Sequence, residues 1–296
     1  MHRIIRIVLL IASVAPAGAQ SQGPAAGIVV SAGAGAFLER GRARVPLALG
    51  ELIYAGDRLV TAGAGATLLF CPTTERITLG AQSTAEVTRD AVAVRKGPAA
   101  TRAKANQCAL PQVALGKESM ERIGGYRARG FPPLPLYFGG PVRGARPVFE
   151  WAAIAGVESY RLVLRSESGN DVWETETRTP RAEYPASQPQ LQPGTYNWEV
   201  KALAGGKTLA QQNADFELRA AAPSAGAAPA DAAARLVAAV AAENEGYWAE
   251  AAAHYRALRA DNPGDLRLAR RLAWLYQNAG LFMAADDELK KAAKAP

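Results

Sequence analysis

Few side chains in this chain have the type and spacing needed for acid-base, metal or thiol chemistry. The sequence holds 2 His and 2 Cys in 296 residues, and His254 is the one histidine beyond the first 19 residues. A metal site built from several histidines of one chain is therefore excluded. Glu174 and Glu176 share one face of an expected strand, on what we expect to be a solvated surface rather than a cleft. We expect no catalytic residue, no metal, no cofactor and no enzymatic activity.

The two cysteines are the remaining reactive pair. Cys71 and Cys108 are too far apart for a CxxC redox motif. In an oxidising compartment they would form a disulfide that closes a loop of about 37 residues and stabilises the fold by roughly 4 kcal/mol. Two buried free thiols are the alternative.

The first 19 residues have the pattern of a secretory signal peptide. Two arginines precede an apolar run over residues 7–15, and Ala17 and Ala19 form a small-x-small cleavage site. The run is shorter than the roughly 20 residues that span a bilayer, and no later stretch comes closer. We expect a mature protein in the periplasm or outside the cell, without a transmembrane span and without a lipid-modified cysteine.

Positive charge is concentrated in the first half of the chain. The net charge is +7, and residues 89–143 alone carry ten Lys or Arg against three acidic residues. An exported protein does not meet nucleic acid, so an anionic cell-wall polymer is one expected partner of this segment. Arg122, Arg127 and Arg129 are the candidate contacts. A solvated linker that is kept soluble by its arginines is the alternative reading.

Hydrophobic periodicity divides the rest into three folded units and two linkers. Residues 27–115 read as short β-prone pieces between Gly-rich turns, which predicts a compact all-β domain. Residues 116–145 form a basic linker rich in Pro and Gly. From 146 to 219 apolar residues alternate with polar ones, which predicts a β-sandwich. After a flexible linker at 220–230, residues 231–296 have helical periodicity.

The first unit resembles a known periplasmic module. Residues 50–70 read G-x-x-I-x-x-G-D, then T-x-x-x-G-A, then L-x-F, and Ile77, Ser83 and Glu86 continue the pattern. This pattern is similar to the FecR-type domain. The resemblance implies an envelope protein and allows a signalling or regulatory role. Asp57 and Ser83 are expected to be structural, because turn and strand-end positions account for them.

The second unit resembles a fibronectin type III or immunoglobulin-like domain. Trp151 stands where the early core tryptophan is expected, and residues 191–200 match the tyrosine-corner region. Tyr196 would donate a hydrogen bond back towards Leu191. The resemblance implies a rigid spacer or binding module. We expect Trp151, Trp173 and Trp198 to pack in the core, with a carbohydrate-stacking platform as the alternative.

The last unit resembles a pair of tetratricopeptide repeats. Asn244 matches Asn278 and Gly246 matches Gly280 at a 34-residue offset. Four helices are expected, at about 231–243, 247–260, 265–278 and 281–294. Because about three repeats are usually needed to bury a continuous core, this pair should borrow surface from a neighbouring domain, a second copy or another protein.

The resemblance also implies a partner-binding surface. In this family the inner helices line a concave face that binds extended peptides. The candidate residues on that face are Asn244, Arg267, Arg270, Trp274, Gln277 and Asn278. The two arginines and two asparagines could hold a carboxylate of the partner, and purely structural stacking is the alternative. His254 is expected on the packed side of the second helix.

The sequence therefore predicts a multidomain, non-enzymatic envelope protein. Two all-β domains precede an all-α pair of helical hairpins, and the protein acts as an adaptor or scaffold through those hairpins. The alternatives are binding of an anionic cell-wall polymer by the basic first half and a FecR-like signalling component.

Overall fold

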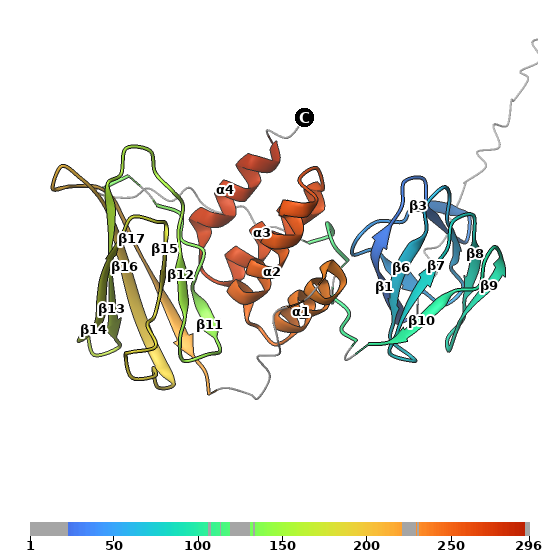
Figure 1. Cartoon of the computed structure of the whole chain (residues 1–296), viewed down its shortest axis with the longest axis horizontal. Coiled ribbons are helices and arrows are strands. Elements are labelled where there is room, and N and C mark those ends of the chain that lie inside the picture. Colours follow the sequence, from blue (N-terminus) through green and yellow to red (C-terminus); the bar gives the residue numbers. More distant parts are fainter. Residues whose placement is uncertain are drawn as a thin grey trace, which may run out of the picture.

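Three folded units make up the computed structural model of the chain. It describes residues 23–105, 108–112, 114–118, 131–132, 134–220, 229 and 231–293. Over these residues, seventeen strands precede four helices along the sequence, as the β-then-α order predicts. In space the order differs, because the helices lie between the two β units (Figure 1). The predicted signal peptide lies outside the described residues.

The first β unit is built from two five-stranded antiparallel sheets. One has the order β10-β7-β6-β1-β4 and the other β3-β2-β5-β8-β9. The strands of the first sheet are β10 (Thr101–Lys104), β7 (Glu75–Leu79), β6 (Ala66–Phe70), β1 (Ala25–Ala32) and β4 (Leu52–Tyr54). The strands of the second are β3 (Ala43–Pro46), β2 (Phe37–Arg40), β5 (Arg58–Val60), β8 (Thr84–Val87) and β9 (Val92–Lys96).

A single turn after β4 carries a buried carboxylate. Gly56 has a φ of 94°, a conformation that favours glycine, and the adjacent Asp57 is 2% exposed. The Asp57 side chain accepts hydrogen bonds from the backbone N–H of Tyr54 at 2.9 Å and from Nε and Nη2 of Arg40 at 2.8 Å each. A buried charge persists when it is paired in this way. Asp57 therefore holds β2 against the β4–β5 turn, which is the structural role expected of it.

The second β unit has a five-stranded sheet of order β11-β17-β16-β13-β14, faced by the pair β12-β15. The strands are β11 (Gly140–Val142), β12 (Val148–Glu150), β13 (Ser159–Ser166), β14 (Asp171–Thr177), β15 (Arg181–Glu183), β16 (Gly194–Ala204) and β17 (Lys207–Leu218). Trp151 and Trp198 are buried in its core, and Trp173 is half-buried against Tyr184. The Tyr196 hydroxyl donates to the carbonyl of Gln192 at 2.8 Å, one residue beyond the expected Leu191.

The second β unit begins earlier than the sequence boundary at 146. Residues 134–142, which the sequence assigns to the linker, pack with this unit, and β11 pairs with β17 in parallel. The ring of Phe138 packs edge to face with Phe149 and with Phe216, with centroids 5.0 and 5.1 Å apart. Aromatic side chains at this density are stable only when they are covered. The linker therefore ends before residue 134, whereas the composition suggests an end at residue 145.

The helical unit consists of two helical hairpins. Its helices are α1 (Ala232–Asn244), α2 (Trp248–Asp261), α3 (Leu266–Asn278) and α4 (Phe282–Ala293). Asp231 and Asp265 cap α1 and α3 through their side chains. The turns inside the hairpins repeat 34 residues apart, since Gly246 and Gly280 have φ values of 80° and 74°. In the described part of the chain, no helix is long and apolar enough to cross a membrane.

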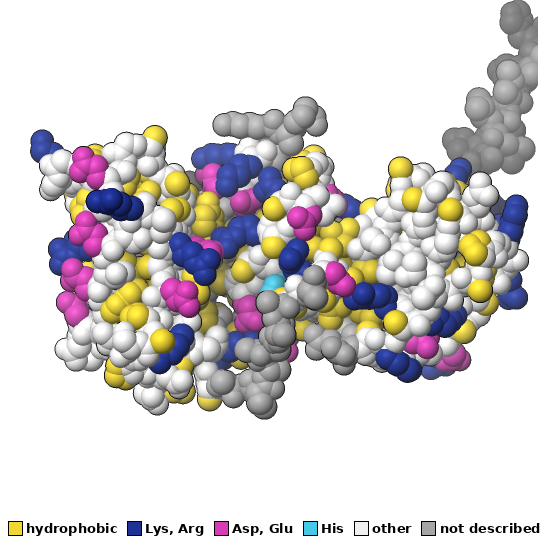
Figure 2. Space-filling view, in the orientation of Figure 1, with side chains coloured by type: hydrophobic (Ala, Val, Ile, Leu, Met, Phe, Trp, Pro, Cys, Tyr) yellow, Lys and Arg dark blue, Asp and Glu magenta, His cyan; other side chains and the backbone are white. Residues whose placement is uncertain are grey.

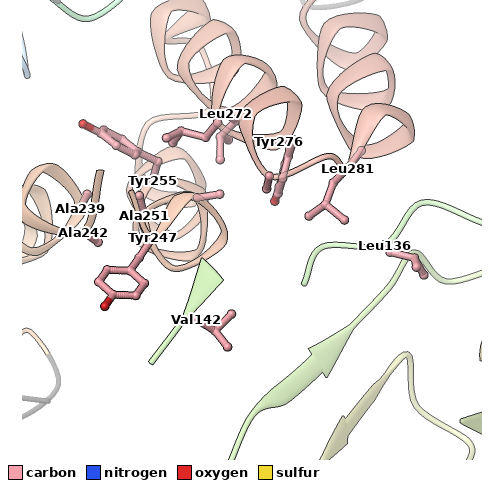
Figure 3. Packing of buried hydrophobic residues seen from close by; sticks show 14 of the residues in the cluster. Leu136, Val142, Ala239, Ala242, Tyr247, Ala251, Tyr255, Leu272, Tyr276 and Leu281 are labelled. Atoms are coloured by element: carbon pink, nitrogen blue, oxygen red, sulfur yellow. The ribbon is translucent and has the colours of Figure 1, made fainter. Parts of the chain in front are cut away.

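The second β unit covers one side of the helical unit, which we call the second-unit face. Figure 3 shows Leu136 and Val142 on the strand side of this contact, and Tyr247, Tyr276 and Leu281 on the helix side. Arg143 pairs with Glu245 and Glu250, each at 2.8 Å, and its guanidinium lies 4.4 Å from the centre of the Tyr247 ring. Arg256 pairs with Glu150 across the same boundary.

Candidate functional site

The opposite side of the helical unit, formed by α1 and α3, faces the first β unit. Residues of β1 point alternately into the unit's own core, as Val29 does, and out towards the helices, as Ile28 and Val30 do. One sheet face and a pair of helical hairpins would each leave apolar surface in water, so each covers the other. The buried cluster that joins them contains Ile28, Val30, Leu52, Leu69, Leu236, Val240, Leu268 and Leu275.

An extended segment of the chain lies across this face. We call residues 108–118 the strap, of which 108–112 and 114–118 are described. Cys108 at its start forms a disulfide with Cys71, so the strap is fastened to the first β unit. Farther along, the side-chain amide of Asn244 donates to the carbonyl of Leu110 at 3.2 Å, and Leu115 is 6% exposed. The strap therefore occupies the face on which the sequence predicts a partner. We call this surface of α1 and α3 the strap face.

The strap ends in a cluster of fully desolvated charges. The side chains of Arg271 and Glu118 are both 0% exposed, and Nε of Arg271 lies 3.2 Å from Oε1 of Glu118. The same Nε lies 3.6 Å from Oε2 of Glu243, whose side chain is 4% exposed. The Glu118 carboxylate also accepts the backbone N–H of Gly116 at 2.9 Å, which bends the strap onto α3. Two carboxylates thus share one guanidinium that α3 supplies.

Burial shifts the pKa values of two side chains here, Glu243 and Tyr255. It raises the pKa of Glu243 above the ordinary carboxyl value of 4.5; Arg271 opposes that shift, and the charge of Glu118 adds to it. Burial also raises the pKa of Tyr255, whose hydroxyl lies 3.5 Å from Oε2 of Glu243. Two glutamates, one arginine and one tyrosine hydroxyl are therefore buried together, and they hold the end of the strap on the helical unit.

Of the first three predicted partner-binding residues along the chain, two contact the strap and one is exposed. Asn244 binds the strap, as described above. Arg267 forms a bidentate pair with Asp265, at 2.9 and 2.6 Å, and its side chain lies against Gly116. Arg270 is exposed.

The other three lie at the C-terminal half of α3. Trp274 is half-buried and packs edge to face with Trp248, with centroids 5.5 Å apart. Asn278 donates to the carbonyl of Trp274 at 2.8 Å, within its own helix. Gln277 is half-buried and has an interaction partner. The structure thus gathers these residues along one helix, with most of their polar groups already engaged.

Sequence reasoning missed the residue at the centre of the site. Arg271 falls three residues after Leu268 and four before Leu275, so it lies on the buried stripe of α3. An arginine at helical spacing among apolar residues is the signal that could have revealed it, because a buried guanidinium requires a carboxylate partner. No comparable pattern points to Glu118, because no feature of the sequence shows that the linker contacts α3.

The predicted polymer-binding residues belong to the basic segment, residues 89–143. Arg122, Arg127 and Arg129 lie outside the described residues. The described part of the basic segment includes β9 and β10, which are edge strands of the two sheets of the first β unit. Both strands expose their basic side chains, which are Arg95, Lys96, Arg102 and Lys104. Figure 2 shows dark blue side chains around the outer end of this unit.

Glu174 and His254 are the residues considered above for acid-base and metal chemistry. Glu174 accepts a hydrogen bond from Nε of Arg161 at 2.6 Å, which lowers the pKa of this exposed carboxylate. Burial lowers the pKa of the half-buried His254. Over the described ranges, no group of three or more His, Cys, Asp or Glu is placed to hold a metal ion.

Comparison with known proteins does not assign this chain to a family. No protein-family model matches the chain. No curated protein matches it. Among solved structures, FN3tt has a TM-score of 0.23 and 13% identity, with 29% of this chain and 97% of that chain covered. CopC from Methylosinus trichosporium OB3b has a TM-score of 0.22 and 15% identity, covering 27% and 82%. Domains d3-d4 of the rat CD45 extracellular region have a TM-score of 0.22 and 13% identity, covering 46% and 94%. TM-scores this low carry neither fold nor function to this chain.

Proposed function

We propose that this protein is a non-enzymatic, exported scaffold of the cell envelope. In this proposal a FecR-type β unit and a fibronectin type III-like unit are joined by a tetratricopeptide-like helical pair. The buried Asp57 turn supports the first assignment. The hydrogen bond from Tyr196 to Gln192 supports the second. The glycine turns 34 residues apart support the third.

The observation that carries the scaffold role is the strap buried on the helical unit. Glu118 on Arg271 and Leu115 in the shared core fill the face where a partner peptide was expected. The second-unit face is covered as well, by β11 and the residues before it. A helical pair covered on both sides holds the two β units in a fixed arrangement, and partners then dock on the outer surfaces of those units.

Small-angle X-ray scattering of the full chain tests the fixed arrangement. The unaltered protein should scatter as one compact body. A Leu115→Asp, Glu118→Lys double variant should show a larger radius of gyration, because it places a cation beside Arg271 and a charge in the core. Lys117→Asp is the matched control, since Lys117 is an exposed strap residue. A wild-type protein that already scatters as independently moving units would refute the proposal.

The site of partner docking needs a separate experiment. A photo-reactive amino acid at exposed Arg270 reports contacts of the strap face, and one at exposed Glu176 on β14 reports contacts of the second β unit. The scaffold proposal expects envelope partners to cross-link at Glu176 and not at Arg270. Cross-links from Arg270 would instead support an adaptor whose partner replaces the strap.

A second candidate function rests on the basic edge of the first β unit. Arg95 and Arg102 pair with Glu86 and Glu75 on the surface, whereas Lys96 has no ion pair with any described residue. Neighbouring exposed cations can bind an anionic cell-wall polymer through charge alone. Co-sedimentation with isolated wall material, compared between wild type and Lys96→Glu, tests it. Binding that is unchanged by this reversal and by Arg122, Arg127 and Arg129 to Ala would exclude it.

A further inference from the structure

A cleft of about 680 Å³ lies between the second β unit and the helical unit. Its walls come from the end of β12, the β14–β15 turn, the C-terminal half of α2, and α4, with Tyr137 beside them. The cleft is open to solvent rather than enclosed, and its volume lies in the range of small-ligand sites, which occur preferentially where domains meet. Figure 2 shows dark blue and magenta side chains together where the left-hand β unit meets the helices.

The cleft carries an excess of positive charge. Four cations line it, Arg181, Arg256, Arg259 and Lys291, against the carboxylates of Glu150 and Glu288. Each carboxylate already pairs with an arginine, Glu150 with Arg256 and Glu288 with Arg259. Lys291 contacts Glu288 and also Asp287, which lies next to the lining. Counting Asp287, the region keeps one positive charge in excess.

The arginines that pair in the cleft are held in place and still have donors to offer. The Arg256 guanidinium lies 5.1 Å from the centre of the Tyr137 ring in addition to its pair with Glu150. A guanidinium has five N–H donors, of which one carboxylate uses at most two. Arg181 is exposed and has no ion pair with any described residue. Preorganised and partly free donors therefore point to an anionic ligand.

The residues that line the cleft indicate which kind of anion it would bind. The planar fork of arginine matches a carboxylate in two parallel hydrogen bonds. Inorganic phosphate offers only oxygen atoms, whereas an organic acid also has carbon atoms that can contact apolar parts of the wall. Tyr137, Pro180 and Pro263 supply apolar surface beside the cations. The buried indole N–H of Trp151, in the same wall, has no hydrogen-bond acceptor in the described part of the chain.

We propose that this cleft binds a small organic ligand through a carboxylate group. Arg181, which has no ion pair with any described residue, is the main contact, and Lys291 is a second cation that the ligand shares with Asp287 and Glu288. The ligand is either a uronic acid or a simple dicarboxylic acid, since both have the same anionic group. This site is separate from the strap face and does not depend on the scaffold role.

Isothermal titration calorimetry of the full-length protein tests the proposal with three probes: digalacturonate, glutarate and inorganic phosphate. We expect saturable binding of at least one of the two carboxylates and weaker binding of phosphate. Digalacturonate alone would identify the sugar acid as the source, and glutarate alone the simple acid. Absence of carboxylate binding, or phosphate binding as tight as carboxylate binding, would overturn the assignment.

Matched variants locate the site. Arg181→Ala and Lys291→Ala should each weaken carboxylate binding about tenfold, as loss of one charge-assisted hydrogen bond does. Arg178→Ala and Lys290→Ala remove exposed cations from the same turn and the same helix, outside the lining, and should leave binding unchanged. Equal weakening by the control substitutions would show a general charge effect and overturn the cleft as the site. Circular dichroism checks that all four variants are folded.

Discussion

The two covered faces of the helical unit use the same kinds of ion pair in different surroundings. On the strap face, Arg271 and Glu118 are 0% exposed. On the second-unit face, Arg143 is 12% exposed while its partner Glu245 is 49% exposed. A desolvated pair becomes costly when one partner is removed, whereas a solvated pair contributes little. The strap face should therefore determine whether the units stay together, and the second-unit face should only adjust how tightly they do.

The largest expected effect comes from removing the buried guanidinium. Arg271→Met leaves Glu118 and Glu243 buried beside each other, which should lower the free energy of unfolding by about 3–5 kcal/mol. Urea unfolding followed by tryptophan fluorescence measures it. Arg270→Met, at the exposed neighbouring position, should change stability by no more than about 0.5 kcal/mol. Equal effects of the two substitutions would show that burying the Arg271 ion pairs adds nothing to the stability of the strap face.

Loss of the disulfide is expected to have the next largest effect. Cys71→Ser with Cys108→Ser frees the start of the strap, and the loop of 37 residues that it closes gives an expected loss of about 2–4 kcal/mol. The same urea titration, with and without dithiothreitol, measures it. Dithiothreitol should destabilise the wild type and leave the serine variant unchanged. A variant as stable as the wild type would show that the strap is held by the Glu118 end alone.

Arg143→Met tests the second-unit face. This change removes pairs with Glu245 and Glu250 and the contact with the Tyr247 ring, and we expect a loss of about 1–2 kcal/mol. Added salt should reduce the difference between the two proteins, since the carboxylates are partly solvated. Arg76→Gln is the control, because its pair with Asp231 is exposed on both sides and should contribute less than about 1 kcal/mol. A loss as large as that of Arg271→Met would reverse the comparison.

The smallest expected effect is a pH dependence. Burial raises the pKa of Glu243 above the ordinary 4.5, so the folded state holds that proton more tightly than the unfolded chain. The resulting stabilisation is complete below about pH 4.5 and is lost as pH rises through the raised pKa. Unfolding titrations across this range should show the decline in wild type. Glu243→Gln cannot ionise, so the stability difference between the variant and the wild type should change with pH; a constant difference would contradict the shift.

The sequence predicted which residues form strands and helices better than it predicted which of these elements pack together. Periodicity predicted an all-β unit at 27–115 and all four helices, and the 34-residue offset located the two turns with Gly246 and Gly280. It assigned residues 134–142 to a linker because proline and glycine density masks the alternation of Leu134, Leu136 and Phe138. These side chains are buried or half-buried against the second β unit.

The candidate site was predictable in part. The sequence predicted that α3 lines a partner-binding face; in the structure Asn244, at the end of α1, contacts the chain's own strap on that face. The sequence did not identify the segment as the chain's own, because Leu110 and Asn244 are 134 residues apart along the chain. Pairing over such separations leaves no local pattern.

Local chemistry determined what the sequence alone could show: which residues form strands or helices, where glycines and capping aspartates end them, and which half of the chain is basic. These depend on backbone conformation and on periods of two or 3.6 residues, which neighbouring residues set. Only the tertiary structure decided that the helices lie between the β units and that Glu118 is buried on Arg271. The physical reason is that apolar faces without a local partner, such as that of Ile28 and Val30, are covered by whichever surface fits them, and that choice depends on the whole chain.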